Sequence, residues 1–132
     1  MHILIIILGL VFTPLAHADS KWTIHTVSTH LITDDMNNVN PGLAYDVRED
    51  IRIGALYNSY NRPSLYAAKI FPIHDRVRVG LGVITGYGWD SDEHDVYGKT
   101  TGVIPLLALE LDVTKHVSII WFGEALNLEL KF

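Results

Sequence analysis

The sequence contains no cysteine, and beyond residue 18 it contains no hydrophobic run long enough to cross a bilayer as a helix. Without cysteine a small exported domain has no disulfide framework, and no lipoprotein anchor can form. Basic charge is also scarce, because 10 Lys and Arg face 15 Asp and Glu and give a net charge of −5. A nucleic-acid-binding protein normally carries a basic patch or stripe, so this class is disfavoured.

The first 18 residues are predicted to be a secretion signal rather than part of the fold. The apolar run Ile3–Val11 is much shorter than the ~20 residues that a transmembrane helix needs. Ala16-His17-Ala18 follows it, and this small-x-small pattern is typical of a signal-peptide cleavage site. We therefore expect cleavage after Ala18, export from the cytoplasm, and a single domain over residues 19–132.

We expect β-strands throughout this domain, because in no segment do apolar residues recur with the period of a helix. The expected strands cover residues 22–31, 42–49, 51–60, 64–72, 76–88, 101–113, 116–122 and 125–132. Around the fifth strand one face carries Val77, Val79, Leu81, Val83, Thr85, Tyr87 and Trp89, and the other carries Arg76, Arg78, Gly80, Gly82, Gly86 and Gly88. The last strand alternates in the same way, with Leu126, Leu128, Leu130 and Phe132 against Asn127, Glu129 and Lys131.

Alternation alone does not choose between two all-β architectures. A soluble β-sandwich buries its apolar face, whereas a membrane barrel turns that face to lipid and its polar face to the lumen. The polar face here holds both signs of charge, with Arg48, Arg52, Lys69, Arg76, Arg78 and Lys131 against Asp46, Glu110, Asp112 and Glu129. Glycines share that face, and they suit the crowded interior of a small barrel. We therefore expect a monomeric, antiparallel, up-and-down transmembrane β-barrel of about eight strands in an outer membrane.

Connections and aromatics agree with this expectation. Long connections at residues 32–40 and 90–100 and a moderate one at 61–63 alternate with short ones near residues 50, 73–75 and 114–115, as outer loops and inner turns do. The short connection Gly123-Glu124 is the exception. Aromatics expected near the membrane interfaces are Trp22, Tyr57, Tyr60, Tyr66, Phe71, Tyr87, Trp89, Trp121 and Phe132. An outer-membrane strand of this kind typically closes the barrel on a terminal Phe.

Three polar residues are expected at the outer rim, His30 after the first strand and Asn58 and Ser59 at the end of the third. Side chains fill an eight-stranded barrel, so function should lie at a rim, in the loops or in a pocket at one mouth. A His beside a Ser supplies a general base and a nucleophile, or a group that polarises a substrate hydroxyl. The alternative is that both are ordinary polar residues of the rim.

The segments Leu56–Ala68, Gly80–Trp89 and Gly102–Phe132 resemble the lipid A palmitoyltransferase family. These small outer-membrane barrels move an acyl chain from a phospholipid to lipid A. The resemblance implies that His30 and Ser59 are catalytic, with Asn58 where the family has Asp. Pro105, within Val-Ile-Pro-Leu-Leu, matches a strand whose proline leaves a lateral opening between strands in the family, since proline donates no ladder hydrogen bond.

The sequence departs from that family in three places. Asn58 lacks the charge of the Asp, no amphipathic helix fits before the first strand, and Ile119-Ile120-Trp121 stands where the family has a second proline. His30 followed by the Asn-rich loop 34–42 also resembles outer-membrane lipid A deacylases, which use a His–Ser pair. Two functions thus remain open: acyl transfer on lipid A or phospholipid, and a barrel with a structural, binding or surface-masking role.

Metal and cofactor sites have little support. Asp34, Asp35, Asn37 and Asn38 offer oxygen ligands for Ca²⁺ but lack the spacing of a defined loop. The acidic loop Asp90–Asp95 is expected to be solvated. Histidines 25, 74, 94 and 116 are scattered and predict no zinc site. No nucleotide or phosphate-binding motif is present, so no cofactor is expected.

Overall fold

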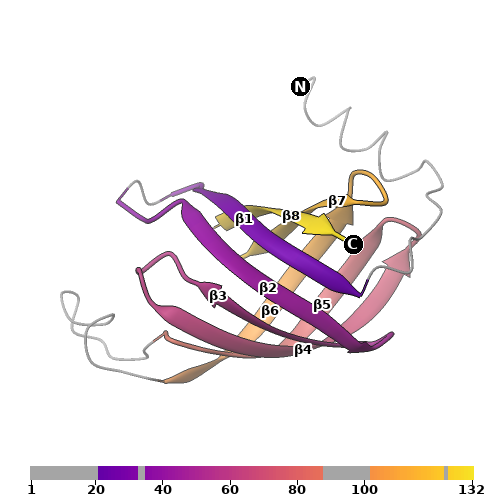
Figure 1. Ribbon diagram of the computed structural model, residues 1–132, viewed down its shortest axis with the longest axis horizontal. Coiled ribbons are helices and arrows are strands. Elements are labelled where there is room, and N and C mark those ends of the chain that lie inside the picture. Colours follow the sequence, from indigo (N-terminus) through magenta and orange to yellow (C-terminus); the bar gives the residue numbers. More distant parts are fainter. Residues whose placement is uncertain (1–20, 33–34, 88–101, 124) are drawn as a thin grey trace.

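The computed structural model describes residues 21–32, 35–87, 102–123 and 125–132, and it is a closed antiparallel β-barrel of eight strands (Figure 1). The strands are β1 (Trp22–His30), β2 (Val39–Arg48), β3 (Ile51–Tyr57), β4 (Pro63–His74), β5 (Val77–Thr85), β6 (Val103–Asp112), β7 (Val117–Phe122) and β8 (Ala125–Lys131). The predicted all-β, eight-stranded antiparallel barrel is confirmed. The described part holds no helix that is long and apolar enough to cross a membrane. The predicted signal segment lies outside the described residues.

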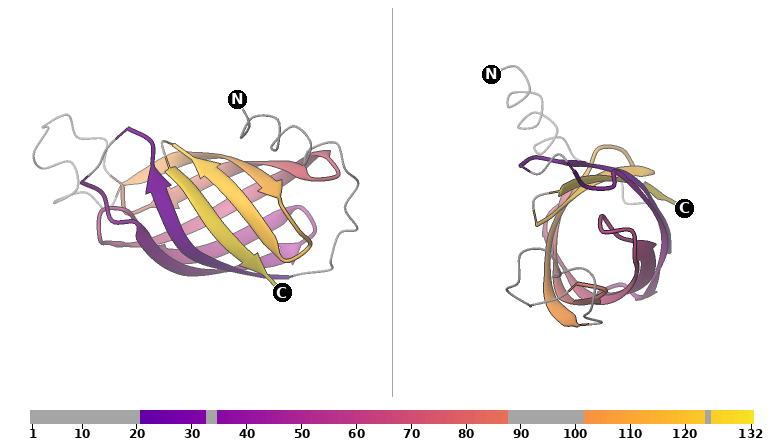
Figure 2. Two further views of the ribbon diagram at one scale, coloured as in Figure 1. Left: turned by 90° about the horizontal axis from the view of Figure 1, so that it is seen from above. Right: turned by 90° about the vertical axis from the view of Figure 1, so that its left-hand side faces the viewer.

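Each strand pairs with its neighbours in the chain, and β1 pairs with β8 to close the ring. The view along the barrel in Figure 2 shows this closure. At the seam the backbone amide of Trp22 donates to the carbonyl of Phe132 over 3.1 Å, and the amide of Phe132 donates to the carbonyl of Trp22 over 2.9 Å. The last residue of the chain therefore completes the ladder of the first strand.

The outer surface of the barrel is apolar along every strand. Large apolar side chains exposed there include Ile24, Leu43, Val47, Ile53, Leu65, Phe71, Leu81, Val83, Leu107, Leu109, Ile119, Trp121 and Leu128. Leu107, midway along β6, is 64% exposed. The period-two alternation puts these residues on one face, and closure of the sheet turns that face outward. This distribution is the reverse of a soluble barrel, which buries its apolar face.

The lumen is divided into a charged half and an apolar half. The charged half consists of Asp46, Arg52, Arg78, Glu110, Asp112 and Lys131, which we call the ion-pair network. Arg52 Nε donates to Asp46 over 2.6 Å, and Arg78 Nη2 lies 2.8 Å from carboxylates of both Glu110 and Asp112. The apolar half is built on the buried cluster of Ala68, Ile70, Ile84 and Leu106.

Two glycines allow close approach inside this narrow barrel. A Cβ on Gly82 would lie 1.9 Å from the carbonyl oxygen of Ala67, and one on Gly54 would lie 2.4 Å from the ring of Tyr66. Gly54 therefore leaves the space that the Tyr66 ring occupies. The expected crowding of the interior is thus seen at Gly54, whereas the restriction at Gly82 comes from the backbone of the neighbouring strand.

Several expected side-chain directions were wrong. Arg48 and Lys69 do not point into the lumen, because both are largely exposed and lie near Asp50 at the short turn between β2 and β3. Tyr66, expected among the aromatics of the membrane interface, points into the lumen instead. The alternation of β5 ends at Gly86, whose φ of +84° is left-handed, and Tyr87 then lines the cavity instead of the outer face.

One end of the barrel, which we call the outer end, carries residues 31–32 and 35–38 between β1 and β2 and residues 58–62 between β3 and β4. The other end carries the short turns β2–β3, β4–β5 and β6–β7, as the loop pattern predicted, and the short step from β7 to β8 at the outer end is the expected exception. The β6–β7 ladder begins at Ala108, which pairs with Phe122. The segment Ile104–Leu107, which contains Pro105, therefore extends past the end of β7, while its other edge stays in register with β5. Among the described residues the barrel wall is thus shortened between these two strands at the outer end.

Candidate functional site

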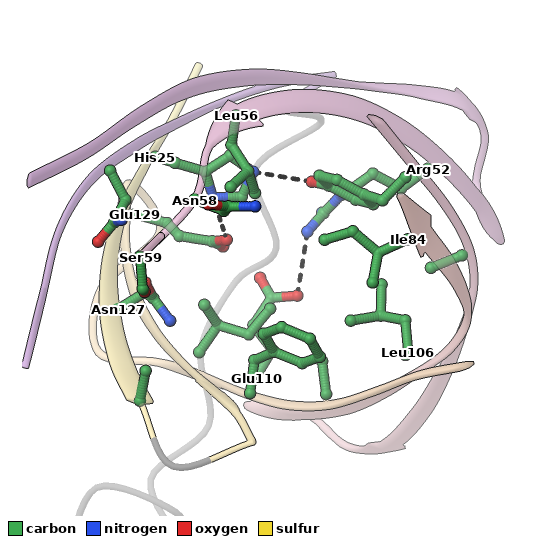
Figure 3. Close-up of a pocket in the computed structure, with 18 of the residues that line it drawn as sticks. His25, Arg52, Leu56, Asn58, Ser59, Ile84, Leu106, Glu110, Asn127 and Glu129 are labelled. Atoms are coloured by element: carbon green, nitrogen blue, oxygen red, sulfur yellow. Dashed lines mark hydrogen bonds and ion pairs between the residues drawn. The ribbon is translucent and has the colours of Figure 1, made fainter. Parts of the chain in front are cut away.

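A cavity of about 70 Å³ lies in the lumen, which is room for several water molecules. Its apolar lining includes Leu56, Ala68, Ile70, Ile84, Tyr87, Leu106, Ala108, Ile120 and Phe122. Its polar lining includes His25, Asn40, Arg52, Asn58, Ser59, Tyr66, Glu110, Asn127 and Glu129. In Figure 3, Ser59, Asn127 and Glu129 lie on one side of the cavity, and Ile84 and Leu106 lie on the opposite side. A ligand here would meet both an apolar and a polar wall.

At the outer mouth, His30 and Ser59 are joined by a side-chain hydrogen bond. His30 ends β1, and Ser59 follows β3 by two residues. The distance from His30 Nε2 to Ser59 Oγ is 2.9 Å, within the range of a nucleophile and its general base. The structure therefore brings together two of the three residues that the sequence nominated.

Asn38 completes this arrangement from the other side of the imidazole. Its Oδ1 lies 2.8 Å from His30 Nδ1, and because an amide oxygen only accepts, Nδ1 carries the proton. Nε2 is then left to accept the hydrogen of the Ser59 hydroxyl. We call Ser59, His30 and Asn38 the rim triad; its order of contacts, hydroxyl to imidazole to amide, is the order in which a nucleophile, a base and an orienting group are arranged in hydrolase triads.

Asn58, the third nominated residue, makes its hydrogen bonds with groups other than His30 and Ser59. Its side chain is fully buried, and its Nδ2 donates to Ser64 Oγ over 2.9 Å and to the carbonyl of Gly86 over 3.1 Å. Its Oδ1 accepts from the backbone amides of Tyr60 and Arg62. All four hydrogen-bonding positions of the amide are thus used to hold the loop 58–62 against β4 and the end of β5.

Backbone contacts fix the loop residues of the triad. The amide of Asn37 donates to the carbonyl of Ser59 over 3.0 Å, and the amide of Ser28 donates to the carbonyl of Asn38 over 2.8 Å. Below them the hydroxyl of Ser28 donates to Oδ1 of the buried Asn40. The first and second outer connections are therefore tied together directly at the triad.

The polar wall of the cavity contains an incompletely satisfied carboxylate. Glu129 is 0% exposed, and neither of its oxygens has a partner with hydrogen-bond geometry among the described residues. His25 Nδ1 lies 2.8 Å from Glu129 Oε1, which meets the distance of an ion pair although its direction does not meet that of a hydrogen bond. His25 Nε2 is in turn 2.8 Å from the hydroxyl of Tyr66.

The sequence reasoning missed Asn38 as the partner of His30 and Glu129 as a cavity residue. Asn38 was considered only as an oxygen ligand for Ca²⁺, because its place within a long loop has no period from which a contact could be read. Within the described residues, no group of three or more His, Cys, Asp or Glu is arranged to hold a metal ion. The acidic loop Asp90–Asp95 lies outside the described residues.

Comparison with known proteins gives no relative from which a role could be transferred: no protein-family model matches this chain, and no curated protein sequence matches it.

Proposed function

We propose that this protein is an outer-membrane enzyme that transfers or releases the acyl group of a lipid ester through Ser59, with lipid A or phospholipid as substrate. The observation that carries the proposal is the rim triad, in which His30 contacts Ser59 on one side and Asn38 on the other. The cavity that Ser59 lines adds support, because its opposite wall is apolar and an acyl chain needs an apolar wall.

The membrane location rests on the outer surface. Soluble monomers rarely expose an apolar patch larger than a few hundred Å². Here large apolar side chains are exposed on all eight strands, while carboxylates and guanidinium groups are buried within. Exposed aromatics lie toward both ends, with Trp22, Phe71 and Phe132 at one end and Tyr57 and Trp121 at the other. This arrangement favours a barrel surrounded by lipid.

The chemistry that the triad supports is two-step acyl transfer. Ser59 Oγ bonds to the ester carbonyl carbon while its proton passes to His30 Nε2. The ester C–O bond then breaks, the departing alcohol oxygen takes that proton, and the acyl group remains on Ser59. In the second step an acceptor hydroxyl gives its proton to His30 Nε2 and bonds to the carbonyl carbon, and Ser59 leaves with the proton. The acceptor is a lipid hydroxyl in transfer and water in hydrolysis.

The carbonyl oxygen gains negative charge in both steps and needs a donor. Asn127 lines the same cavity as Ser59 and lies on the inner face of β8. The preceding inward-facing residue of β8 is Ala125, which pairs with His30. Its amide has two N–H donors. We assign the amide of Asn127 to the oxyanion in this proposal.

Lipid access is proposed between β6 and β7. The segment Ile104–Leu107 continues past the last pair of the β6–β7 ladder, Ala108 with Phe122. Pro105 in this segment has no backbone N–H. The shortened wall therefore leaves one fewer unpaired donor facing lipid, which lowers its free-energy cost. Leu106 and Phe122 at this place also line the cavity.

Mass spectrometry of lipid A and phospholipids from cells with and without the protein tests the proposal. We expect gain or loss of one acyl chain with the wild type, and no change with Ser59→Ala or His30→Ala. The matched control is Ser118→Ala, a buried serine in β7 that does not line the cavity. An unaltered lipid profile with folded wild-type protein would reject the enzyme and favour the structural or binding role.

A further inference from the structure

The apolar outer face of the barrel is interrupted by charge at one place. Lys69, midway along β4, faces outward, and its side chain is 53% exposed. It pairs with Ile51 of β3 and Leu81 of β5, and its Nζ lies 5.5 Å from the centroid of the Phe71 ring. Apart from Arg48 at the end of β2, no other Lys, Arg, Asp or Glu lies on this face of the described strands. A lysine among lipid-facing apolar residues is costly unless its ammonium group reaches the headgroup region.

A β-bulge brings Arg48 to the same face. Asp46 pairs with Arg52 and points into the lumen, so strict alternation would turn Arg48 inward as well. The register shifts between Asp46 and Arg48, and Arg48 then pairs with Ile51. Such an extra residue changes the direction of the side chains that follow it. Because Ile51 also pairs with Lys69, the two cations flank Ile51 on the outer face, beside the β2–β3 turn.

A carboxylate of this turn bridges the two cations. Asp50 Oδ1 is 3.6 Å from Arg48 Nε, and Asp50 Oδ2 is 3.7 Å from Lys69 Nζ. Both distances are too long for hydrogen bonds, so each ion pair leaves room for a second acceptor at its cation. The backbone fixes the turn, since the amide of Ile70 donates to the carbonyl of Asp50 over 2.8 Å. Glu49, which precedes Asp50, is exposed.

The charges of this cluster indicate which headgroup fits it. Two cations stand against two carboxylates, those of Glu49 and Asp50, so the cluster has no net charge. A purely anionic headgroup would be attracted by the cations and repelled by the carboxylates. A zwitterionic headgroup with a primary ammonium group matches both signs, because its phosphate accepts from Arg48 and Lys69 while its ammonium donates to Asp50. Phosphatidylethanolamine is the phospholipid with this chemistry.

We propose that Arg48, Asp50 and Lys69 form a binding site for the headgroup of phosphatidylethanolamine on the outside of the barrel. The acyl chains of this lipid pack on exposed side chains farther from the turn, such as Ile53 and Val83. The inference rests on the membrane location within the proposed function. It is independent of the proposed chemistry, because the β2–β3 turn lies at the end of the barrel opposite the rim triad.

Native mass spectrometry of the protein in detergent tests the site by measuring the first lipid bound from an equimolar mixture of three phospholipids with the same acyl chains. Phosphatidylcholine has the phosphate but no N–H on its nitrogen, and phosphatidylglycerol has the phosphate but no ammonium group. Wild-type protein should bind phosphatidylethanolamine about fivefold better than either, a factor that corresponds to one exposed charge pair. Asp50→Asn should shift the preference to phosphatidylglycerol, because it leaves the cations in excess.

Lys69→Met should reduce the binding of phosphatidylethanolamine about fivefold, and methionine suits a lipid-facing position, so this variant should fold. The matched control is Lys115→Met, which removes an exposed lysine from the β6–β7 turn and should keep the wild-type preference. Equal binding of the three lipids by the wild type, or tighter binding of phosphatidylglycerol, would overturn the site. Retention of the wild-type preference in Lys69→Met would also overturn it.

These measurements involve no turnover, which separates the inference from the proposed chemistry. If cells show no change in lipid A or phospholipid while the purified protein prefers phosphatidylethanolamine, the enzyme proposal fails and the site stands. If the lipid profile changes while the three phospholipids bind equally, only the headgroup site is rejected. A protein that stays folded and soluble without detergent or vesicles would instead reject the membrane location, and the headgroup site with it.

Discussion

His30 Nε2 lies 2.9 Å from Ser59 Oγ, although the two residues are 29 positions apart, His30 at the end of β1 and Ser59 in the connection after β3. The contact exists because β1 and β3 both run toward the same end of the barrel, with β2 between them. Asn38 reaches the opposite nitrogen of the imidazole from the beginning of β2. Three neighbouring strands therefore supply one residue each to a site at the rim.

Asn38→Ala should lower the rate of ester cleavage without preventing folding. The mutation removes the acceptor that holds the proton on His30 Nδ1, and loss of one such bond, worth about 1 kcal/mol, predicts a fall of roughly fivefold in kcat. Steady-state cleavage of an acyl ester measures it. Asn38→Asp restores an acceptor at the same place and should recover activity toward the wild-type rate; equal loss in both variants would contradict the orienting role.

Asn58→Ala should affect stability rather than chemistry. Its amide satisfies the Ser64 hydroxyl, the Gly86 carbonyl and two backbone amides of the loop 58–62. Each buried group left without a partner costs about 1–3 kcal/mol. The temperature at which the folded, fast-migrating form is lost on unboiled gels should therefore fall well below that of the wild type. An unchanged temperature with lost activity would instead favour a direct catalytic role for Asn58.

Arg52→Met should destabilise the barrel by about 3–5 kcal/mol, because it removes the cation that contacts Asp46 and one of the three cations that contact the buried carboxylate of Glu110. Arg48→Met is the matched control. The Arg48 side chain is 75% exposed and pairs only loosely with Asp50 at 3.6 Å, whereas that of Arg52 is 4% exposed. The control should change stability by less than about 1 kcal/mol. Urea unfolding of protein refolded in lipid vesicles measures both, and similar losses would contradict the burial difference.

Gly82→Ala should prevent proper closure of the sheet between β4 and β5. Its Cβ would meet the backbone carbonyl oxygen of Ala67 at 1.9 Å, which neither a rotamer change nor a small shift relieves. Gly80→Ala, two residues away on the same face, meets only ordinary contacts, the nearest at 3.5 Å. We expect no heat-modifiable folded form for the first variant and a wild-type yield for the second. Folding of both would show that the β4–β5 spacing adjusts more easily than these distances allow.

Leu107→Arg tests the lipid-facing surface. If that surface contacts lipid, an arginine at mid-strand should cost about 2–4 kcal/mol and reduce folding into vesicles. Ile32→Arg places the same charge in the outer connection, where the cost should fall to about 0–1 kcal/mol. Folded fractions from gel mobility give the comparison. A soluble, folded Leu107→Arg protein without vesicles would overturn the membrane location.

Much of the fold could be predicted from the sequence, because the alternation of apolar and polar side chains along a strand is a local property. Alternation predicted strands over residues 76–88 and 101–113, and β5 and β6 lie within these ranges at Val77–Thr85 and Val103–Asp112. The loop pattern placed the longer connections at one end. Strand ends were less accurate: β2 begins at Val39 rather than residue 42, and β3 ends at Tyr57 rather than residue 60. These errors lie beside Asn38 and Asn58. Asn58 was nominated because it stands where the resembling family has Asp, and Asn38 had no such signal.

The residue sequence by itself determined the strand faces, the net separation of apolar and polar surfaces, and His30 and Ser59 as candidates. Tertiary structure alone decided which lumen charges pair, that Tyr66 and Tyr87 turn inward, that Asn38 rather than Asn58 contacts His30, and that the buried Glu129 lies beside a cavity. The reason is physical. Alternation depends only on neighbours along one strand, whereas each of these contacts depends on the stagger between strands and on the left-handed backbone at Gly86, neither of which leaves a periodic signal.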